Sequence, residues 1–245
     1  QEPESLDLYA FSRNFLADFF SGIYLRLVDV VSTKRYTSLA RIGERMLLWT
    51  VQAYDFWEIL QRDGVYRTDP SLVDPDFLFA YQWLVDVMKQ RIGNPPEDYM
   101  FPVWAWYQWR GPKRRKPDLR SGGFIGKREK GVRIEFELED SQVLLSDFDL
   151  WHFVLNYWYL PYNEEDHKRF EEELEKKGIS YYNQKPLADI DAHQKIVRSW
   201  ERIFDLSWVD EKGYVAYPAE EKSVQATFWE LRIDQVRKVK EFRQR

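Results

Sequence analysis

Apolar and polar residues alternate most regularly between Val132 and Glu139. The residues Val132, Ile134, Phe136 and Leu138 fall on one face of an extended chain, and Arg133, Glu135, Glu137 and Glu139 fall on the other. Successive side chains of a strand point to its two faces in turn. The pattern therefore predicts a strand with one face in the core and the other in water or lining a site.

Three further strands are predicted from short apolar runs. They cover residues 47–51, 103–109 and 224–231. In the second run, Trp104 and Trp106 lie on one face, while Tyr107 and Trp109 lie on the other. Because large aromatic side chains favour burial, we expect the rest of the protein to cover both faces of this strand.

Apolar residues spaced three and four apart predict six helices after residue 46. They cover residues 54–61, 75–92, 147–159, 164–177, 189–200 and 234–242. Asp74, Ser146 and Asn163 are the expected N-caps of the second, third and fourth of these helices. Their side-chain oxygens can accept hydrogen bonds from the unpaired N–H groups of a first helical turn.

This order of elements has no repeated strand–helix–strand unit, which favours an α+β fold. We expect a single domain over residues 46–245, with a small mixed or antiparallel sheet flanked by about six helices. Residues 1–45 stand apart, with helical spacing over residues 6–31. Two alternatives stay open for them: a genuine helical extension, or a misassigned start of translation, with Met46 as the true first residue.

Composition narrows the class of protein. Of the 245 residues, 44% are hydrophobic and 17% aromatic, enough to bury a core. There is no Cys, which excludes disulfides, thiolate metal sites and a cysteine nucleophile and fits a cytoplasmic protein. Three scattered His predict no metal site, and no cofactor is expected. No apolar run approaches the roughly 20 residues of a membrane helix, so no membrane partner is expected.

Cations are concentrated between Arg110 and Lys130, although the chain as a whole carries a net charge of −5. Nine Lys and Arg residues stand there against Asp118 and Glu129, so this segment carries +7 and the remainder −12. The contrast predicts an anion-binding loop between two strands.

The predicted ligand-binding residues are Trp106, Trp109, Arg110, Lys113, Arg114, Arg115, Lys116 and Arg120. Guanidinium and ammonium groups bind phosphate oxygens, and Trp rings stack on bases. The glycines of the loop match neither a Walker motif nor a dinucleotide fingerprint. The alternative is a solvated hairpin loop above an aromatic core, in which Asp118 pairs with an arginine.

A polar stripe on the third helix contains the first candidate for catalysis, His152. Asp149, Asn156 and Tyr159 lie on the same face of that helix. A carboxylate that fixes the histidine tautomer would let the imidazole act as a general base. The alternative is a stripe that faces solvent or pairs with nearby backbone.

Glu135 and Glu137 are the other candidates for catalysis. They project to the same side of their strand, where proximity would raise the pKa of one of them. The pair resembles the Glu-x-Glu strand of arginine-modifying ADP-ribosyltransferases, whose Ser-Thr-Ser strand is absent here. The alternative is an ordinary exposed strand face that Arg133 neutralises.

Four segments carry a resemblance to a known family. They are LLWTVQAYDFWEIL, FPVWAWYQWRGPKRRKPDLR, VLLSDFDLWHFVLNYWYLP and TFWELRIDQVRKVKEF. Together they resemble a bacterial family labelled domain of unknown function 3841, over residues 46–245. The resemblance implies no established activity, cofactor or catalytic residue.

We therefore expect an intracellular protein that binds a phosphate-bearing ligand, either a nucleotide or single-stranded nucleic acid, through the basic loop and the aromatic strand. Two alternatives remain. One is an enzyme that uses a nucleotide or NAD and is similar to the ADP-ribosyltransferases. The other is a structural or protein-interaction domain whose loop binds an acidic partner protein. The sequence leaves enzymatic activity and oligomeric state open.

Overall fold

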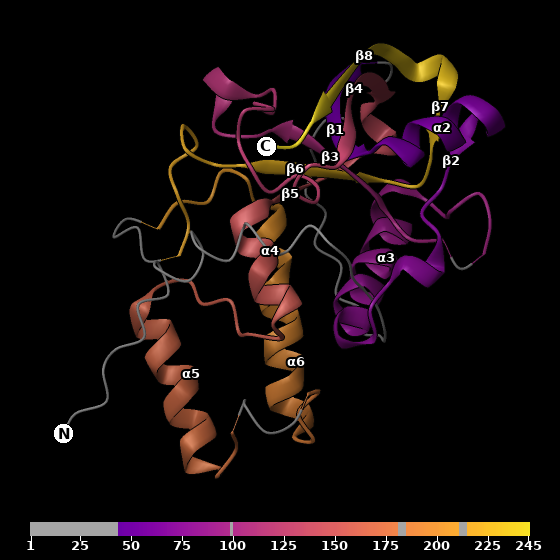
Figure 1. Ribbon diagram of the computed structural model, residues 1–245. Coiled ribbons are helices and arrows are strands. Elements are labelled where there is room, and N and C mark those ends of the chain that lie inside the picture. Colours follow the sequence, from indigo (N-terminus) through magenta and orange to yellow (C-terminus); the bar gives the residue numbers. More distant parts are fainter. Residues whose placement is uncertain (1–43, 99, 181–184, 211–214) are drawn as a thin grey trace.

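The computed structural model describes residues 44–245 apart from residue 99 and residues 181–184 and 211–214. The helix expected over residues 6–31 lies outside the described residues. Within them, the chain forms an α+β domain of five α-helices, a six-stranded sheet and a two-stranded sheet (Figure 1). The predicted fold class is confirmed, although the main sheet is larger than expected and the helices are fewer.

The main sheet has the strand order β5-β6-β3-β1-β4-β8, and all neighbouring strands are antiparallel. Its strands are β1 (Arg45–Ala53), β3 (Val103–Gln108), β4 (Lys130–Glu139), β5 (Leu144–Asp147), β6 (Val224–Phe228) and β8 (Val236–Arg243). The short strands β2 (Val65–Tyr66) and β7 (Leu231–Arg232) pair with each other. The strand predicted over residues 224–231 is thus divided into β6 and β7.

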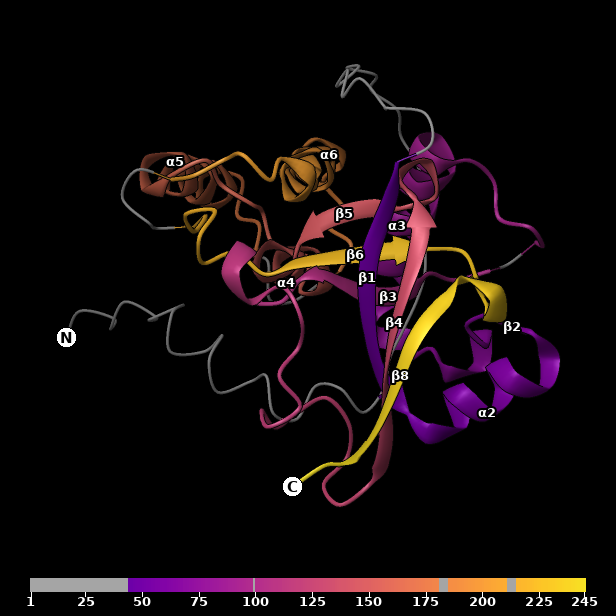
Figure 2. The same ribbon diagram turned by 90° about the horizontal axis from the view of Figure 1, so that it is seen from above.

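A strong twist separates the main sheet into two halves, because β5 and β6 run nearly across the direction of β1, β4 and β8 (Figure 2). The halves join where β1 meets β3, through the single residue pair Trp49 and Trp106. Glu135 lies opposite Trp49, and Gln225 lies opposite Trp106. These four side chains therefore point to one face of the sheet, which we call the site face.

Helix α2 (Tyr54–Asp63) covers the other face of the sheet. Its Phe56 and Leu60 are buried against residues from four strands. Those residues include Leu48, Val103, Ile134, Phe136, Ala226 and Phe228. The alternation in β4 is as predicted, because its apolar residues enter this core and its charged residues point to the site face.

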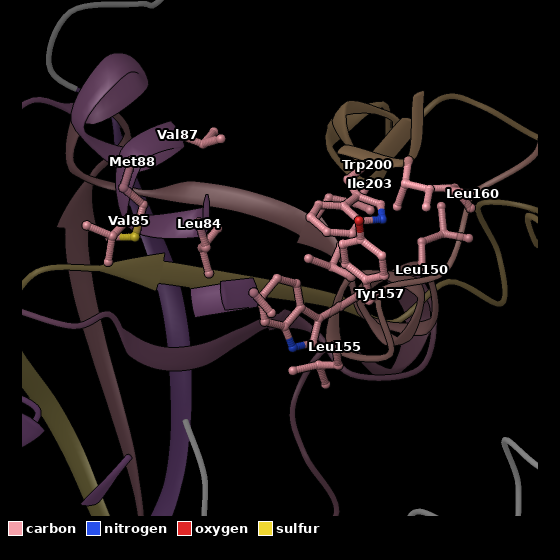
Figure 3. Packing of buried hydrophobic residues seen from close by; sticks show 14 of the residues in the cluster. Leu84, Val85, Val87, Met88, Leu150, Leu155, Tyr157, Leu160, Trp200 and Ile203 are labelled. Atoms are coloured by element: carbon pink, nitrogen blue, oxygen red, sulfur yellow. The ribbon is translucent and has the colours of Figure 1, made fainter. Parts of the chain in front are cut away.

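Three helices cover the β5-β6-β3 half of the site face: α3 (Leu78–Ile92), α4 (Phe148–Leu155) and α6 (Ile190–Ser199). Their apolar residues form a second core, in which Trp200 is 1% exposed. Figure 3 shows part of this core, with Leu84 of α3, Leu150 of α4 and Trp200 in one cluster. The charged helix α5 (Glu164–Lys176) packs on its outside through Phe170 and Leu174.

Of the three predicted N-caps, Asn163 is confirmed, because its side chain accepts a backbone hydrogen bond at the start of α5 over 2.9 Å. Asp74 caps a 3-10 turn, Pro75–Phe77, instead, and α3 begins only at Leu78 without a side-chain cap. Helix α4 differs, because its N-cap is Asp147, which accepts from the N–H groups of the next turn. Ser146 belongs to β5 instead. The helix also ends at Leu155 rather than near residue 159, and Tyr157 has a left-handed φ of 58°.

The helix predicted over residues 234–242 is wrong, since a 3-10 turn ends at Gln235 and the rest of this segment belongs to strand β8. Val236 and Val239 are three residues apart, which resembles helical spacing. A bulge in the β4–β8 register turns both toward the same core, whereas Phe242 lies over Gly131 on the site face. Among the described residues, no helix is long and apolar enough to span a membrane.

Candidate functional site

The loop between β3 and β4 is fixed at its start by the turn that precedes β6. Gly111 donates its backbone N–H to the carbonyl oxygen of Lys222 over 2.9 Å. With a φ of 78°, Gly111 also lies so close that a Cβ atom would be 1.9 Å from the carbonyl oxygen of Glu220. The side chain of Gln108 donates to the Lys222 carbonyl oxygen over 2.9 Å. The close contact leaves room only for glycine at residue 111.

The end of the loop is fixed by β4 and β8. Gly131 leaves room for Ile125 and Phe242, whose nearest atoms would lie 2.4 and 2.8 Å from a Cβ atom there. Arg128 donates its backbone N–H to the carbonyl oxygen of Gln244 over 3.0 Å. Figures 1 and 2 show the loop running beside the C-terminal end of β8. Contacts at both ends therefore fix the loop that carries the cations.

A concave surface of about 860 Å³, which we call the basic cavity, lies between this loop and the β1-β4-β8 half of the site face. Its lining includes eight cationic residues: Arg110, Lys113, Arg114, Arg115, Lys116, Arg120, Arg133 and Lys240. Asp118 is the one acidic residue among the described lining residues. The rings of Trp49 and Trp109 complete the wall. This excess of positive charge in a concave surface attracts anions.

Two cations of the basic cavity are already paired. Arg120 forms an ion pair with Asp118, and its hydrogen bonds lower the pKa of the Asp118 carboxyl to about 2. Lys116 forms an ion pair with Glu135, which also accepts a 2.7 Å hydrogen bond from Nε1 of Trp49. The expected pairing of Asp118 with an arginine is confirmed.

Two further arginines bind backbone carbonyl groups. Arg115 donates Nε to the carbonyl oxygen of Tyr107 over 3.1 Å, and its guanidinium lies 4.3 Å from the centre of the Tyr107 ring. Arg133 donates to the carbonyl oxygen of Pro117 over 2.6 Å. These contacts hold the wall of the cavity, and within the described residues neither arginine forms an ion pair with a carboxylate. Burial lowers the pKa of Arg133, and the nearby negative charges of Glu135 and Asp118 oppose that effect.

Three cations at the rim of the basic cavity are available to a ligand. Within the described part of the chain, Arg110, Lys113 and Arg114 form no ion pair with a carboxylate. The guanidinium of Arg110 lies 4.5 Å from the centre of the Trp109 ring. Stacking on an aromatic face orients a guanidinium and leaves its N–H donors free at the edge.

A second concave surface, of about 840 Å³, adjoins the first, and we call it the aromatic cavity. It shares Trp109, Arg110, Lys113, Arg114 and Ser121 with the basic cavity. Its other aromatic lining residues are Trp106, Phe124, Phe148 and Tyr217. Three acids line it as well: Asp149, Glu220 and Glu221. The two cavities therefore adjoin along the basic loop but differ in charge.

Asp149 is the titratable group that stands out in the aromatic cavity. Burial and the negative charge of Asp147 raise the pKa of Asp149 to about 7, against the opposing charge of Lys222. No hydrogen bond or ion pair within the described residues involves the Asp149 carboxyl group, which lines the cavity. A carboxyl of this kind can donate or accept a proton near neutral pH.

A buried ion pair lies behind Asp149. Lys222 and Asp147 are each 1% exposed, and their charged groups are 3.4 Å apart. The Lys222 ammonium also donates to the carbonyl oxygens of Leu206 and Trp208, over 3.2 and 2.6 Å. The same lysine holds Gly111 through its backbone, so the pair links the start of the loop to the start of α4.

His152 is not among the described lining residues of either cavity. Its Nδ1 lies 3.1 and 3.2 Å from the backbone carbonyl oxygens of Phe148 and Asp149, so the Asp149 carboxylate does not set its tautomer as expected. Burial lowers the pKa of His152. The polar stripe is also broken, because Asn156 ends the helix and Tyr159 donates to Asp166. A catalytic role for His152 stays a prediction.

Glu135 and Glu137 each contact a separate cation. Partial burial tends to raise the pKa of Glu135, but hydrogen bonds from Lys116 and Trp49 hold it below its ordinary value. The rise that proximity predicts is therefore not found at Glu135. Glu137 forms an ion pair with Arg237 of β8, over 3.1 Å. Each carboxylate thus has its own cation, and the proposed catalytic use of the pair stays a prediction.

Several residues that build the site were not predicted from the sequence. Phe124, Phe148, Glu220 and Glu221 line the aromatic cavity, and Lys222 lies buried behind it. The Asp147–Phe148–Asp149 run at a helix start was one available signal, since capping acids gather there. Lys222 gives no signal, because burial of a lysine depends on partners that are distant in sequence.

The chain belongs to the family described as domain of unknown function (DUF3841), which residues 47–237 match. This match confirms the resemblance found in the sequence and falls within its expected span. Neither the curated proteins nor the solved structures contain a match to this chain.

Proposed function

We propose that the protein binds a phosphate-bearing ligand, a nucleotide or single-stranded nucleic acid, in the basic cavity. The charge of that cavity carries the proposal, because eight cations and one acid line the same concave surface. Such an excess of positive charge attracts polyanions and repels cations. A nucleotide ligand also fits the cytoplasmic location expected from the sequence.

The arrangement of the cations supports phosphate rather than carboxylate as the anion. Arg110 and Arg114 each offer a planar set of N–H donors, which match two oxygens of a phosphate group. Lys113 adds a compact charge beside them. A ligand with several phosphates would use all three groups, whereas one carboxylate would satisfy a single arginine.

An enzyme that acts on a nucleotide is the second candidate function. Asp149 favours it, since a carboxyl with a pKa of about 7 borders the cavity next to the proposed phosphate site. Glu135, by contrast, is bound by Lys116 within the basic cavity wall. Incubation with nucleoside triphosphates and NAD, followed by chromatography of the products, tests this candidate.

Calorimetric measurement of tripolyphosphate binding tests the proposed phosphate site. A triple variant, R110A/K113A/R114A, removes the three loop cations that form no ion pair within the described residues; its control, K168A/R169A/K176A, removes equal charge from the exposed surface of α5. We expect about tenfold or greater loss of affinity in the first and little change in the second. Affinity should also fall steeply between roughly 50 and 200 mM salt. Equal binding by the two triple variants would overturn the proposal.

A further inference from the structure

We propose that the aromatic cavity holds the base and sugar of a nucleoside di- or triphosphate whose phosphates occupy the basic cavity. This inference rests on the proposed function and names the class of ligand: a free mononucleotide rather than a polymer. It is carried by the contrast between two adjoining cavities, by the aromatic walls of one of them, and by a carboxyl group that has no partner among the described residues.

The two cavities differ in a way that matches the two ends of a nucleotide. The basic cavity has eight cations against one acid, whereas the aromatic cavity has three cations and three acids. Phosphates need the first environment. Sugar hydroxyls and base N–H groups are hydrogen-bond donors, for which the carboxylates of Glu220 and Glu221 and the carboxyl oxygens of Asp149 are the matching acceptors.

The cavities are also continuous. Arg110, Lys113 and Arg114 line both, so they stand at the boundary where the sugar of a bound nucleotide would join its phosphates. Trp49 lines the basic cavity and Trp106 the aromatic cavity, and these two residues form the register pair between β1 and β3. One ligand can therefore extend across the junction of the two sheet halves on the site face.

The aromatic walls come from separate parts of the chain. Trp106 of β3 and Phe148 of α4 have ring centres 4.9 Å apart, and Trp109 and Phe124 of the loop have ring centres 5.7 Å apart. Trp106 and Phe124 are only 8% and 5% exposed, so packing fixes them before a ligand arrives. Preformed aromatic walls with a few polar groups are typical of cofactor and nucleotide pockets.

Asp149 supplies the polar group that would orient the base. The carboxyl of this residue lines the cavity, and within the described residues it makes no hydrogen bond or ion pair. A partly buried carboxyl without a partner is costly unless a ligand supplies one. Its raised pKa is the expected consequence of that isolation.

The volumes are consistent with this division. The cavities measure about 840 and 860 Å³, within the range of roughly 300–1,000 Å³ that is usual for small-molecule sites. Either would be large for a phosphate chain alone, and together they give room for a complete nucleoside triphosphate.

Comparison of ligands tests the inference separately from the proposed phosphate site. Calorimetry at one ionic strength is carried out with tripolyphosphate, ATP, GTP and a single-stranded RNA oligonucleotide. We expect ATP or GTP to bind about tenfold more tightly than tripolyphosphate, as one stacked base would provide. If tripolyphosphate binds and neither nucleotide binds more tightly, the inference is overturned while the phosphate site stands. If none of the four binds, both fail. Tighter binding of the oligonucleotide than of either mononucleotide also overturns the inference.

Variants of the acidic residues in the aromatic cavity test whether the base of the nucleotide lies there. Asp149→Ala and Glu221→Gln should each weaken binding of the preferred nucleotide, while affinity for tripolyphosphate stays the same or rises because a negative charge is lost. Circular dichroism and thermal unfolding check that each variant is folded. Glu221 is exposed, so its variant remains informative if Asp149→Ala is unstable. An unchanged preference for nucleotide over tripolyphosphate in both folded variants would contradict the placement of the base.

Discussion

The two halves of the site face begin from the same kind of strand and are covered in opposite ways. Over most of β5, β6 and β3, helices α3, α4 and α6 form an apolar core around Trp200, and the aromatic cavity borders this core at Trp106 and Phe148. Over β1, β4 and β8, a loop without regular helices or strands of its own beyond one short 3-10 turn leaves cations around a cavity. The difference shows that the covering segment, rather than the sheet, decides whether the face stabilises the fold or is open to a ligand.

Replacement of a tryptophan in each half should therefore give the largest difference in the free energy of unfolding. Trp200→Ala removes a ring that is 1% exposed, contacts Trp83 and Tyr157, and donates to the carbonyl oxygen of Trp158 over 2.7 Å. We expect the free energy of unfolding to fall by about 3–5 kcal/mol. Trp109→Ala, beside the cavities, should cost about half as much or less. Urea denaturation measures both, and equal losses would contradict the contrast.

Loss of the buried ion pair between Lys222 and Asp147, beside β5 and β6, should have the next largest effect on stability. Lys222→Met keeps the length of the side chain but leaves Asp147 buried without its cation. Loss of one partner of a buried pair costs about 3 kcal/mol or more. The double variant D147N/K222M removes both charges and should recover part of that loss. Urea denaturation of Lys222→Met, Asp147→Asn and the double variant measures these losses. If the loss in the double variant equalled the sum of the two single losses, the pair would contribute no coupling energy.

The pH dependence of the free energy of unfolding should show a smaller effect, which comes from Asp149. Asp149 keeps its proton up to a pH of about 7 in the folded protein, because burial raises its pKa, while in the unfolded chain the carboxyl has its ordinary pKa of 3.8. Between these values the unfolded state binds fewer protons, so the contribution of Asp149 to stability falls as pH rises. Asp149→Asn cannot ionise and should be more stable relative to wild type at pH 8 than at pH 5, by about 2 kcal/mol. Paired urea titrations at the two pH values measure this difference; no change with pH would show that Asp149 is exposed to solvent.

The ion pair in the basic cavity should have the smallest effect on stability. Glu135→Gln removes the carboxylate from Lys116, whose side chain is 39% exposed, so we expect a loss below about 1 kcal/mol. The same change frees a cation of the cavity. Affinity for tripolyphosphate should therefore increase, and calorimetry beside the control Glu58→Gln on α2 tests this. A weaker affinity would show that Glu135 positions the cavity wall instead of competing with the ligand.

Elements that follow local rules of spacing and capping were the more predictable ones. The alternation of β4, the cap of Asn163 and the inward face of α2 follow local rules of spacing, and all three are found in the structure. Strand β8 was misread because a bulge imitates helical spacing, and a bulge depends on the partner strand. The loop was recognised by its charge. Its division into two cavities was not predictable, since Phe124, Phe148 and Glu220 meet only through the fold.

The order in which the main sheet is paired has a consequence for protein synthesis. Strand β3 finds its partner β6 more than a hundred positions later, as with Trp106 and Gln225, and β4 pairs with β8 near the end of the chain. Residues 217 to 240 also supply walls of both cavities. A nascent chain on the ribosome can therefore form α2 and the β1–β4 pairing early, but the ligand site can be completed only after these late residues have emerged.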